Sequence, residues 1–220
     1  LGKWSEPVKL PPSICTDANE SNPIFNTKRT IMYFTRCPHV KNEKHGCDIW
    51  MSKKVGNDYS EPVMLALAPE STDKKDSSVI VVEHAALSAD DATMVFASNM
   101  PGTKGGLDLW MVKLNPDGMP LGKATNLGGD VNTKKHDQFP FLRKNGTLYF
   151  SSDGYPGMGG MDIFMAEKTG EGTWGQVLNM KSPINSNGDD FGVAFDGDEE
   201  RGYLSSNRQG GKGQDDIYRF

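Results

Sequence analysis

The stretch HDQFPFLRKNGTLYFSSDGYPGMGGMDIFMAEKTGEGTWGQVLNM, residues 136–180, decides the fold. It contains four short runs of strand-forming residues, separated by residues that favour turns. The runs cover residues 139–142, 147–150, 162–165 and 174–178. Asn145-Gly146 predicts a tight type I′ hairpin between the first two runs, with φ > 0 at both residues. The stretch therefore predicts a four-stranded antiparallel meander, whose faces need neighbouring layers to cover them.

The same unit recurs along the chain. One hydrophobic landmark near the end of the second run recurs at Phe34, Phe96, Phe150 and Leu204, with spacings of 62, 54 and 54. An aspartate that opens the third run recurs at Asp48, Asp108, Asp162 and Asp216, with spacings of 60, 54 and 54. Because two independent landmarks share one period, the chain predicts an all-β fold, a β-propeller of four-stranded antiparallel blades.

We expect a single propeller domain over residues 1–220. Its blades are predicted at about 22–67, 79–127, 137–180 and 190–220. Residues 1–10 resemble the fourth run of the unit, and the last blade lacks that run. We therefore expect residues 1–10 to supply an outer strand that closes the ring and removes an exposed sheet edge. The ring has four blades if it is complete, and five or more if an upstream blade is missing; the sequence leaves both open.

Composition and charge exclude some classes of partner. The chain carries a formal net charge of −5 and a sequence pI of about 5.4. A protein without a basic stripe has no electrostatic footprint for nucleic acid. No apolar run approaches the roughly 18 residues of a membrane-spanning segment. We therefore expect no nucleic-acid partner and no direct membrane insertion.

The loop between Cys37 and Cys47 replaces the glycine-rich bend of the other repeats. The two cysteines then lie near the facing ends of two hairpin strands, which can bring their Cα atoms within disulfide range. The loop also contains His39 and His45, so a metal site is the alternative. We favour a disulfide, because no second ligand pair completes a structural zinc pattern.

The repeated polar residues are predicted to be structural. Glycines supply φ > 0 in the bends, and the aspartate that follows each bend can accept backbone N–H groups. The chain contains no nucleophile elbow and no phosphate-binding loop. Nothing singles out a carboxylate pair of the kind glycosidases use. We therefore assign no catalytic, cofactor-binding or metal-binding residue and expect a protein that is not an enzyme and has no cofactor.

Several strings resemble a known family. They are TyrPheThrArgCysPro at 33–38, SerSerAspGlyTyrProGlyMetGlyGlyMetAspIlePhe at 151–164 and ProIleAsnSerAsnGlyAspAspPheGly at 183–192. The repeat unit resembles WD40-like PD40 repeats, to which TolB-type propellers are related. The strings are similar to the propeller domain of OmpA-family lipoproteins of Bacteroidetes. The resemblance implies a periplasmic, outer-membrane-associated protein of type IX secretion, whose contact with peptidoglycan runs through a domain outside this chain.

Three functions compete at this point. The first is a non-enzymatic protein–protein interaction scaffold that binds other secretion-system or cell-envelope proteins. Tyr155, Met158 and Met161 in the bend of the third blade are its predicted contact residues; packing of the methionines over the blade edge is the alternative. The second function is a carbohydrate-binding or muropeptide-binding propeller, lectin-like or glycosidase-like. The third is a TolB-like propeller that binds a peptide in its central channel.

Overall fold

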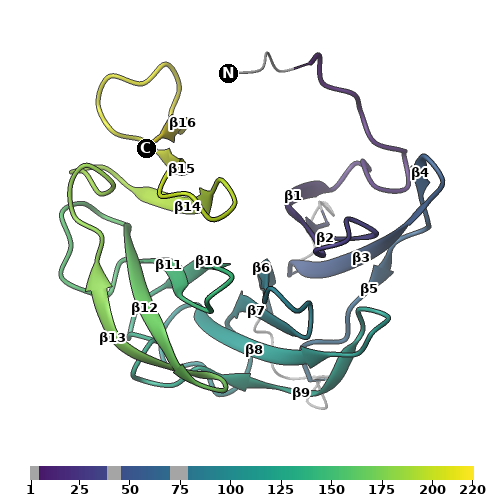
Figure 1. Ribbon diagram of the computed structural model, residues 1–220, viewed down its shortest axis with the longest axis horizontal. Coiled ribbons are helices and arrows are strands. Elements are labelled where there is room, and N and C mark those ends of the chain that lie inside the picture. The colour runs from purple at the N-terminus through teal and green to yellow at the C-terminus, as the bar shows by residue number, and fades with distance from the viewer. Residues whose placement is uncertain (1–4, 39–45, 70–78) are drawn as a thin grey trace.

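The computed structural model describes residues 5–38, 46–69 and 79–220. These residues form sixteen strands in four antiparallel sheets, and none of them forms a helix. The sheets are blades arranged around a common centre, with the first strand of each blade innermost (Figure 1). The predicted all-β propeller with four blades is therefore confirmed. No described helix is long and apolar enough to cross a membrane.

Each blade is a meander in sequence order. The first contains β1 (Asn19–Phe25), β2 (Ile31–Cys37), β3 (Asp48–Val55), β4 (Asp58–Tyr59) and β5 (Val63–Met64). The second contains β6 (Val82–Leu87), β7 (Thr93–Ser98), β8 (Asp108–Leu114) and β9 (Pro120–Asn126). The third contains β10 (Asp137–Leu142), β11 (Leu148–Ser152), β12 (Asp162–Gly170) and β13 (Thr173–Asn179). The fourth contains β14 (Asp190–Phe195), β15 (Gly202–Ser206) and β16 (Asp216–Arg219).

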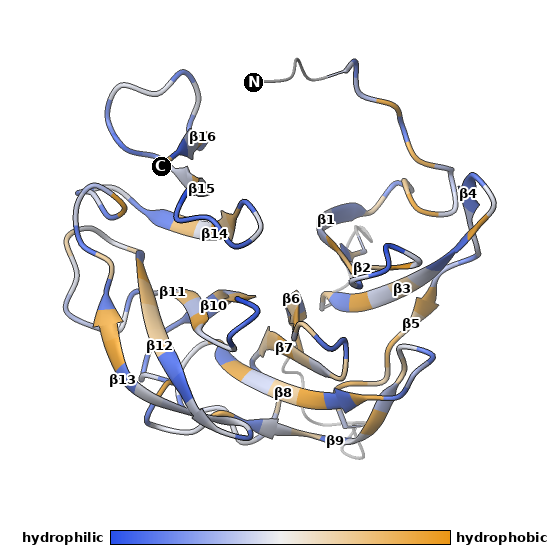
Figure 2. Cartoon of the chain, in the orientation of Figure 1, coloured by the Kyte–Doolittle hydropathy of each residue, from blue (hydrophilic) through white to orange (hydrophobic). Residues whose placement is uncertain are grey.

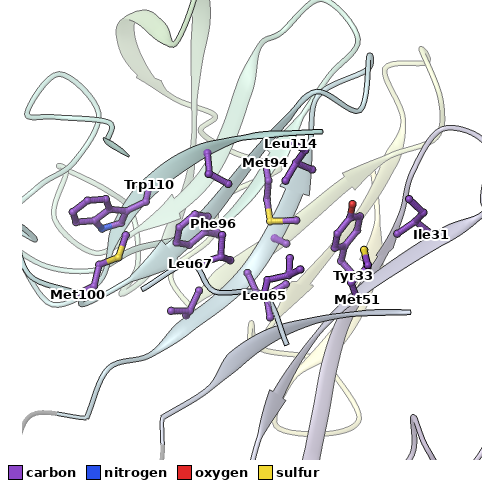
Figure 3. Packing of buried hydrophobic residues seen from close by; sticks show 14 residues of the cluster. Ile31, Tyr33, Met51, Leu65, Leu67, Met94, Phe96, Met100, Trp110 and Leu114 are labelled. Carbon is purple, nitrogen blue, oxygen red and sulfur yellow. The ribbon is translucent and has the colours of Figure 1, made fainter. Parts of the chain in front are cut away.

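The core lies between blades rather than within one. Tyr33 and Met51 of blade one and Phe96 of blade two belong to one buried cluster, which Figure 3 shows. The hydroxyl of Tyr33 donates a hydrogen bond to the carbonyl of Gly118, at 2.9 Å, and so satisfies its polar group inside that cluster. Hydrophobic residues follow strands such as β8, whereas the loop between β15 and β16 is hydrophilic (Figure 2). Because each blade covers its neighbour, the second strands of the first three blades are almost entirely buried, whereas β15 in blade four is partly exposed.

The hairpin at Asn145-Gly146 differs from the type I′ prediction. Gly146 has φ of 86°, whereas Asn145 is not among the residues with positive φ. The amide of Gly146 donates to the carbonyl of Arg143, and the amide of Arg143 donates to the carbonyl of Thr147. This is a longer loop in which one glycine alone takes the left-handed conformation. The asparagine side chain instead accepts a hydrogen bond from the amide of Thr147, at 3.0 Å.

The closing strand predicted at residues 1–10 is wrong for residues 5–10. These residues form no strand, and they are exposed, with Val8 at 89%. Residues 1–4 lie outside the described part of the chain. The fourth blade accordingly has three described strands. Pro7 offers one physical reason, because a proline has no N–H for a ladder. The matching segment of blade one is also interrupted at a proline, Pro62, between the two-residue strands β4 and β5.

Candidate functional site

The bends between second and third strands are fixed from within by aspartates. The carboxylate of Asp162 accepts the amides of Met158 and Gly159, at 2.8 and 3.1 Å. Asp108 and Asp216 accept two bend amides each in the same way. The structural role predicted for these aspartates is confirmed by those contacts. These hydrogen bonds therefore fix the backbone path of each bend and so the positions of the side chains that it carries.

A row of aromatic rings crosses the inner strands of three blades. His84 stacks on Phe139 with ring centroids 3.8 Å apart, and Phe139 lies 5.0 Å from Phe191. His84 and Phe139 both have positive φ, 56° and 53°, and each lies in a β-bulge. A bulge redirects side chains relative to simple strand alternation. The bulges therefore bring rings from β6, β10 and β14 into one row near the centre.

A recess of about 400 Å³ opens where this row meets the bend of blade three. Phe139, Phe191 and Met161 supply its apolar lining, and all three side chains are half-buried. Its other lining residues are Asp153, Gly160, Asp189 and Asp215. Apolar surface next to a few converging polar groups is typical of ligand sites.

The three aspartates differ in how they are held. Asp153 accepts the amide of His136, at 2.8 Å, and Asp189 accepts the amide of Met161, at 2.9 Å. Asp189 also accepts from the side-chain amide of Asn207, at 2.8 Å. Asp215 is exposed and makes no side-chain hydrogen bond within the described residues. Each carboxylate retains acceptor capacity, so the rim of the recess favours cations.

The structure places the three predicted contact residues in different surroundings. Tyr155 is half-buried between blades, where its hydroxyl donates to the carbonyl of Val131, at 2.9 Å. Burial raises the pKa of Tyr155 to about 12, so it stays a neutral donor. Met158 is 49% exposed on the bend. Met161 alone lines the recess, and its sulfur accepts a contact of 3.6 Å from the side-chain amide of Gln138.

A second hollow, of about 440 Å³, lies between the turns of blades two and three. Four cationic side chains line it, but three of them form ion pairs. Lys113 pairs with Glu171, Arg143 with Glu200 and Lys144 with Asp198. Because most of its charge is already compensated, this hollow gives a weaker reason to expect a charged ligand than the recess does.

The disulfide predicted between Cys37 and Cys47 is present, with Cα atoms 4.1 Å apart. His39 and His45, the other half of the metal alternative, lie outside the described residues. Cys15 is a free thiol of intermediate exposure.

Sequence reasoning missed Phe139, Phe191, Asp189 and Asp215 as site residues. In the sequence, each of these residues fits the pattern of a strand or a loop, and nothing marks it as part of a site. The available signal was positional: Phe139 and His84 occupy the same bulge position of successive first strands, and Phe191 lies one residue before it.

Comparisons with solved structures show what the fold resembles. TolB from Acinetobacter baumannii superposes with a TM-score of 0.56 at 11% sequence identity, covering 92% of this chain and 41% of that chain. A protein assigned as TolB from Agrobacterium tumefaciens gives 0.54 at 13% identity, covering 86% and 54%. An α-L-arabinofuranosidase from Lactobacillus brevis gives 0.53 at 13% identity, covering 86% and 68%. The chain thus spans about half the length of the TolB structures.

No protein family and no curated protein sequence matches the chain. The likeness to the solved structures therefore concerns the fold alone, a β-propeller, which TolB and the arabinofuranosidase share.

Proposed function

We propose that this chain is a non-enzymatic propeller that binds a peptide segment of a partner protein at the recess lined by Phe139, Phe191 and Met161. The observation that carries the proposal is the meeting of an aromatic floor with an acidic rim at one open recess. Aromatic and methionine side chains are favoured in protein-binding surfaces because they bury large apolar areas. The acidic rim favours a segment that carries lysine or arginine beside its apolar residues.

A binding role suits the way the carboxylates are held. Asp153 and Asp189 fix backbone amides of their own bends, so they are parts of the frame as well as of the rim. A group that holds the fold is poorly placed to change protonation during a reaction. Met158, on the exposed bend beside Met161, extends the proposed surface. Tyr155 supports that surface from behind, through its hydrogen bond to Val131.

We place the protein in the periplasm, as part of an outer-membrane-associated assembly of type IX secretion, with a resemblance to the component PorE. The family-like strings quoted above support this assignment. The Cys37–Cys47 disulfide is compatible with an oxidising compartment. In this proposal other envelope proteins are the partners, and peptidoglycan is bound only through a domain outside this chain.

The test compares peptide binding by the native chain, a Phe139→Ala/Phe191→Ala variant and a Leu121→Ala control. Leu121 is 63% exposed on the outer strand β9, so its loss should leave the recess intact. Labelled ten-residue peptides that vary in net charge and apolar content serve as ligands, with fluorescence anisotropy as the readout. We expect basic, apolar peptides to bind best. The double variant should weaken this binding about tenfold or more, since each ring supplies roughly 1–2 kcal/mol of contact.

The rim is tested separately by Asp215→Asn, which removes one charge without breaking a described hydrogen bond. We expect a loss of about twofold to fivefold for basic peptides, which shrinks as salt is raised because an exposed charge is screened. A chain that binds no peptide but retains oligosaccharides or muropeptides on an array would sink the proposal in favour of the carbohydrate alternative. Unchanged binding by the double variant would show that the peptide binds at a site other than this recess.

A further inference from the structure

The chain contains one seven-residue pattern twice, at the entries to blades three and four. The two segments are AsnLeuGlyGlyAspValAsn at 126–132 and AsnMetLysSerProIleAsn at 179–185. Both have the form Asn-Φ-x-x-x-Φ-Asn, in which Φ is an apolar residue and x is any residue. We call this form the covering motif, because each copy bonds to the third strand of the blade that precedes it.

The first copy of the covering motif makes a connected set of hydrogen bonds to blade two. The amide of Leu127 donates to the carbonyl of Leu109, at 3.0 Å. The side chain of Asn132 accepts the amide of Leu109 and donates to its carbonyl, at 2.8 and 3.0 Å. It also donates to the side-chain oxygen of Asn126, at 2.9 Å, so the two asparagines of the motif hold each other in place.

The second copy makes the same bonds to blade three. The amide of Met180 donates to the carbonyl of Ile163, at 3.1 Å. The side chain of Asn185 bonds to both backbone groups of Ile163, at 2.8 Å each, and donates to Asn179, at 3.0 Å. Ile163 and its counterpart Leu109 are both 0% exposed. One short segment therefore contributes to covering a third strand and satisfies its outward-facing backbone groups.

Blade four presents the same part of a third strand without such a segment. Ile217 of β16 has the register of Ile163 of β12, since each lies opposite a serine of the second strand. Gly202 and Phe220 exchange two backbone hydrogen bonds, so the alternation of an antiparallel pair turns the amide and carbonyl of Ile217 to the free edge. No described residue bonds to either group, and Ile217 is 77% exposed.

The segment that enters blade one does not match the covering motif. Residues 9–15 are LysLeuProProSerIleCys, with apolar residues at both required places but lysine and cysteine instead of the two asparagines. Leu10 is the residue whose amide would reach a third strand, yet residues 5–10 form no strand and are exposed. Both copies of the motif that the chain does contain are already bonded to blades two and three.

We propose that the free edge of blade four at Ile217 is a docking site for a partner protein that carries an exposed, extended segment of the form Asn-Φ-x-x-x-Φ-Asn. The first apolar residue would donate its amide to the carbonyl of Ile217, and the last asparagine would bond to both backbone groups. The second apolar residue would pack on the Ile217 side chain, as Ile184 packs in one cluster with Ile163. Tyr203, which is 39% exposed, lies on the same face by strand alternation and enlarges the apolar surface.

This mode of recognition has a clear division of energy. Main-chain hydrogen bonds to a free sheet edge supply affinity, and side-chain contacts supply specificity. Here the specificity comes from the two asparagines, because only an amide side chain offers a donor and an acceptor together. The site differs from the recess in the ligand it selects, since it requires no basic residue.

The experiment uses the full chain and a labelled peptide with the sequence of residues 123–134, which contains the first copy of the motif and no proline. Fluorescence anisotropy measures affinity, and NMR locates the site. We expect chemical-shift changes centred on β16 and at least tenfold slower hydrogen exchange at the Ile217 amide, which gains an acceptor. Peptides with Asn132→Ala or with an N-methylated Leu127 should bind at least tenfold more weakly. Changes centred on β8 would mean that the peptide replaces its own copy and would overturn the proposal.

Matched variants of the chain separate this edge from other surfaces. Ile217→Lys places a charge where an apolar residue should pack and should weaken binding at least fivefold. Leu178→Lys makes the same change at an exposed side chain of β13 and should leave the affinity unchanged. The Phe139→Ala/Phe191→Ala variant should also bind this peptide with native affinity, so the result is independent of the recess. Loss of binding in that variant but not in Ile217→Lys would overturn the proposal.

A Leu10→Pro variant tests whether the chain's own segment takes the edge instead. Proline at this place has no amide to donate to the carbonyl of Ile217. If the native chain binds no peptide and Leu10→Pro binds it, the edge belongs to residues 5–10 of the same chain and the proposal is wrong. Absence of binding by both chains at millimolar peptide overturns it as well.

Discussion

Ile163 and Ile217 occupy equivalent places in blades three and four, yet their surroundings are opposite. Each follows the aspartate that opens a third strand and pairs with a serine of the second strand, Ser151 or Ser205. Ile163 is 0% exposed, whereas Ile217 is 77% exposed. Blade three has an outer strand, β13, that blade four lacks among the described residues, but the cluster in which Ile163 is buried includes Leu204 of the next blade. Burial of a third strand in this fold is conferred by the next blade.

The third strand of a blade is covered in part by the loop that enters the next blade. Ile184 of that loop belongs to the same buried cluster as Ile163. Asn185 clamps the strand: its side-chain oxygen accepts the amide of Ile163, and its nitrogen donates to the carbonyl of Ile163, both at 2.8 Å. Asn132 clamps Leu109 between blades two and three in the same way, at 2.8 and 3.0 Å. One amide side chain thus satisfies two buried backbone groups.

The loop that enters blade one has the same backbone turn, but its described contacts are to its own blade and it has no asparagine clamp. The amides of Ile14 and Cys15 both donate to the carbonyl of Pro11, as the amide of Asn185 donates to that of Lys181. Ile14 is buried, but its cluster partners, Met32 and Phe34 among them, belong to blade one. Cys15 stands where the loops entering blades three and four have an asparagine, and a thiol cannot supply both an amide donor and a carbonyl acceptor.

The largest effect should come from shortening the isoleucine on the covered strand. Ile163→Ala removes fully buried apolar surface and leaves a cavity, so we expect a loss of about 2–5 kcal/mol in the free energy of unfolding. Ile217→Ala removes a side chain that is already in water and should change stability by less than about 0.5 kcal/mol. Urea denaturation followed by tryptophan fluorescence measures both. Similar losses in the two variants would mean that Ile217 is covered in solution.

Removing the asparagine clamp should have an intermediate effect. Asn185→Ala leaves the buried amide and carbonyl of Ile163 without their side-chain partners, at a cost of about 1–3 kcal/mol. Cys15→Ala removes no described hydrogen bond and should cost less than about 0.5 kcal/mol. The same urea titrations compare the two variants. If both lose the same stability, the clamp is not what distinguishes the two loops.

Much of the frame could be predicted from the sequence, because it repeats. Phe96 and Phe150 recur in register and are buried at 0% exposure in interblade clusters. The bend aspartates recur for a local reason, since Asp162 bonds to amides three and four residues before it. Features that depend on one blade alone are thus visible as a period in the chain.

Features that depend on two blades were harder to predict. Tyr155 belongs to a bend with an apolar, surface-like sequence, but its hydroxyl reaches Val131 in the loop that leaves blade two. The row from His84 to Phe191 requires bulges, which break the alternation that strand prediction uses. The recurrence of Val131-Asn132-Thr133 and Ile184-Asn185-Ser186 was a readable signal for the clamp. The role of the asparagine becomes clear only in the structure, where it bonds to the backbone of a strand in the preceding blade.

The smallest effect should be local and should separate two arginines. Arg36 donates to the carbonyls of Ser13 and Ile14, at 2.9 and 3.0 Å, and Arg208 holds the carbonyls of Pro183 and Ile184 in the same manner. The loop entering blade four has the Asn185 clamp as a second anchor, whereas the loop entering blade one has no clamp among the described contacts.

Arg36→Lys keeps a cation beside the Glu20 carboxylate but removes the guanidinium that holds both carbonyls, so it should speed amide hydrogen exchange at Ile14 and Cys15 by about tenfold. Arg208→Lys likewise keeps a cation beside the buried Asp190 carboxylate and should leave exchange at the Asn185 amide within about threefold of the native rate. Hydrogen exchange followed by NMR resolves these amides individually, and global stability should change little in the first variant. Equal acceleration at both loops would show that the arginine, rather than the clamp to the preceding blade, is the main anchor of these two entry loops.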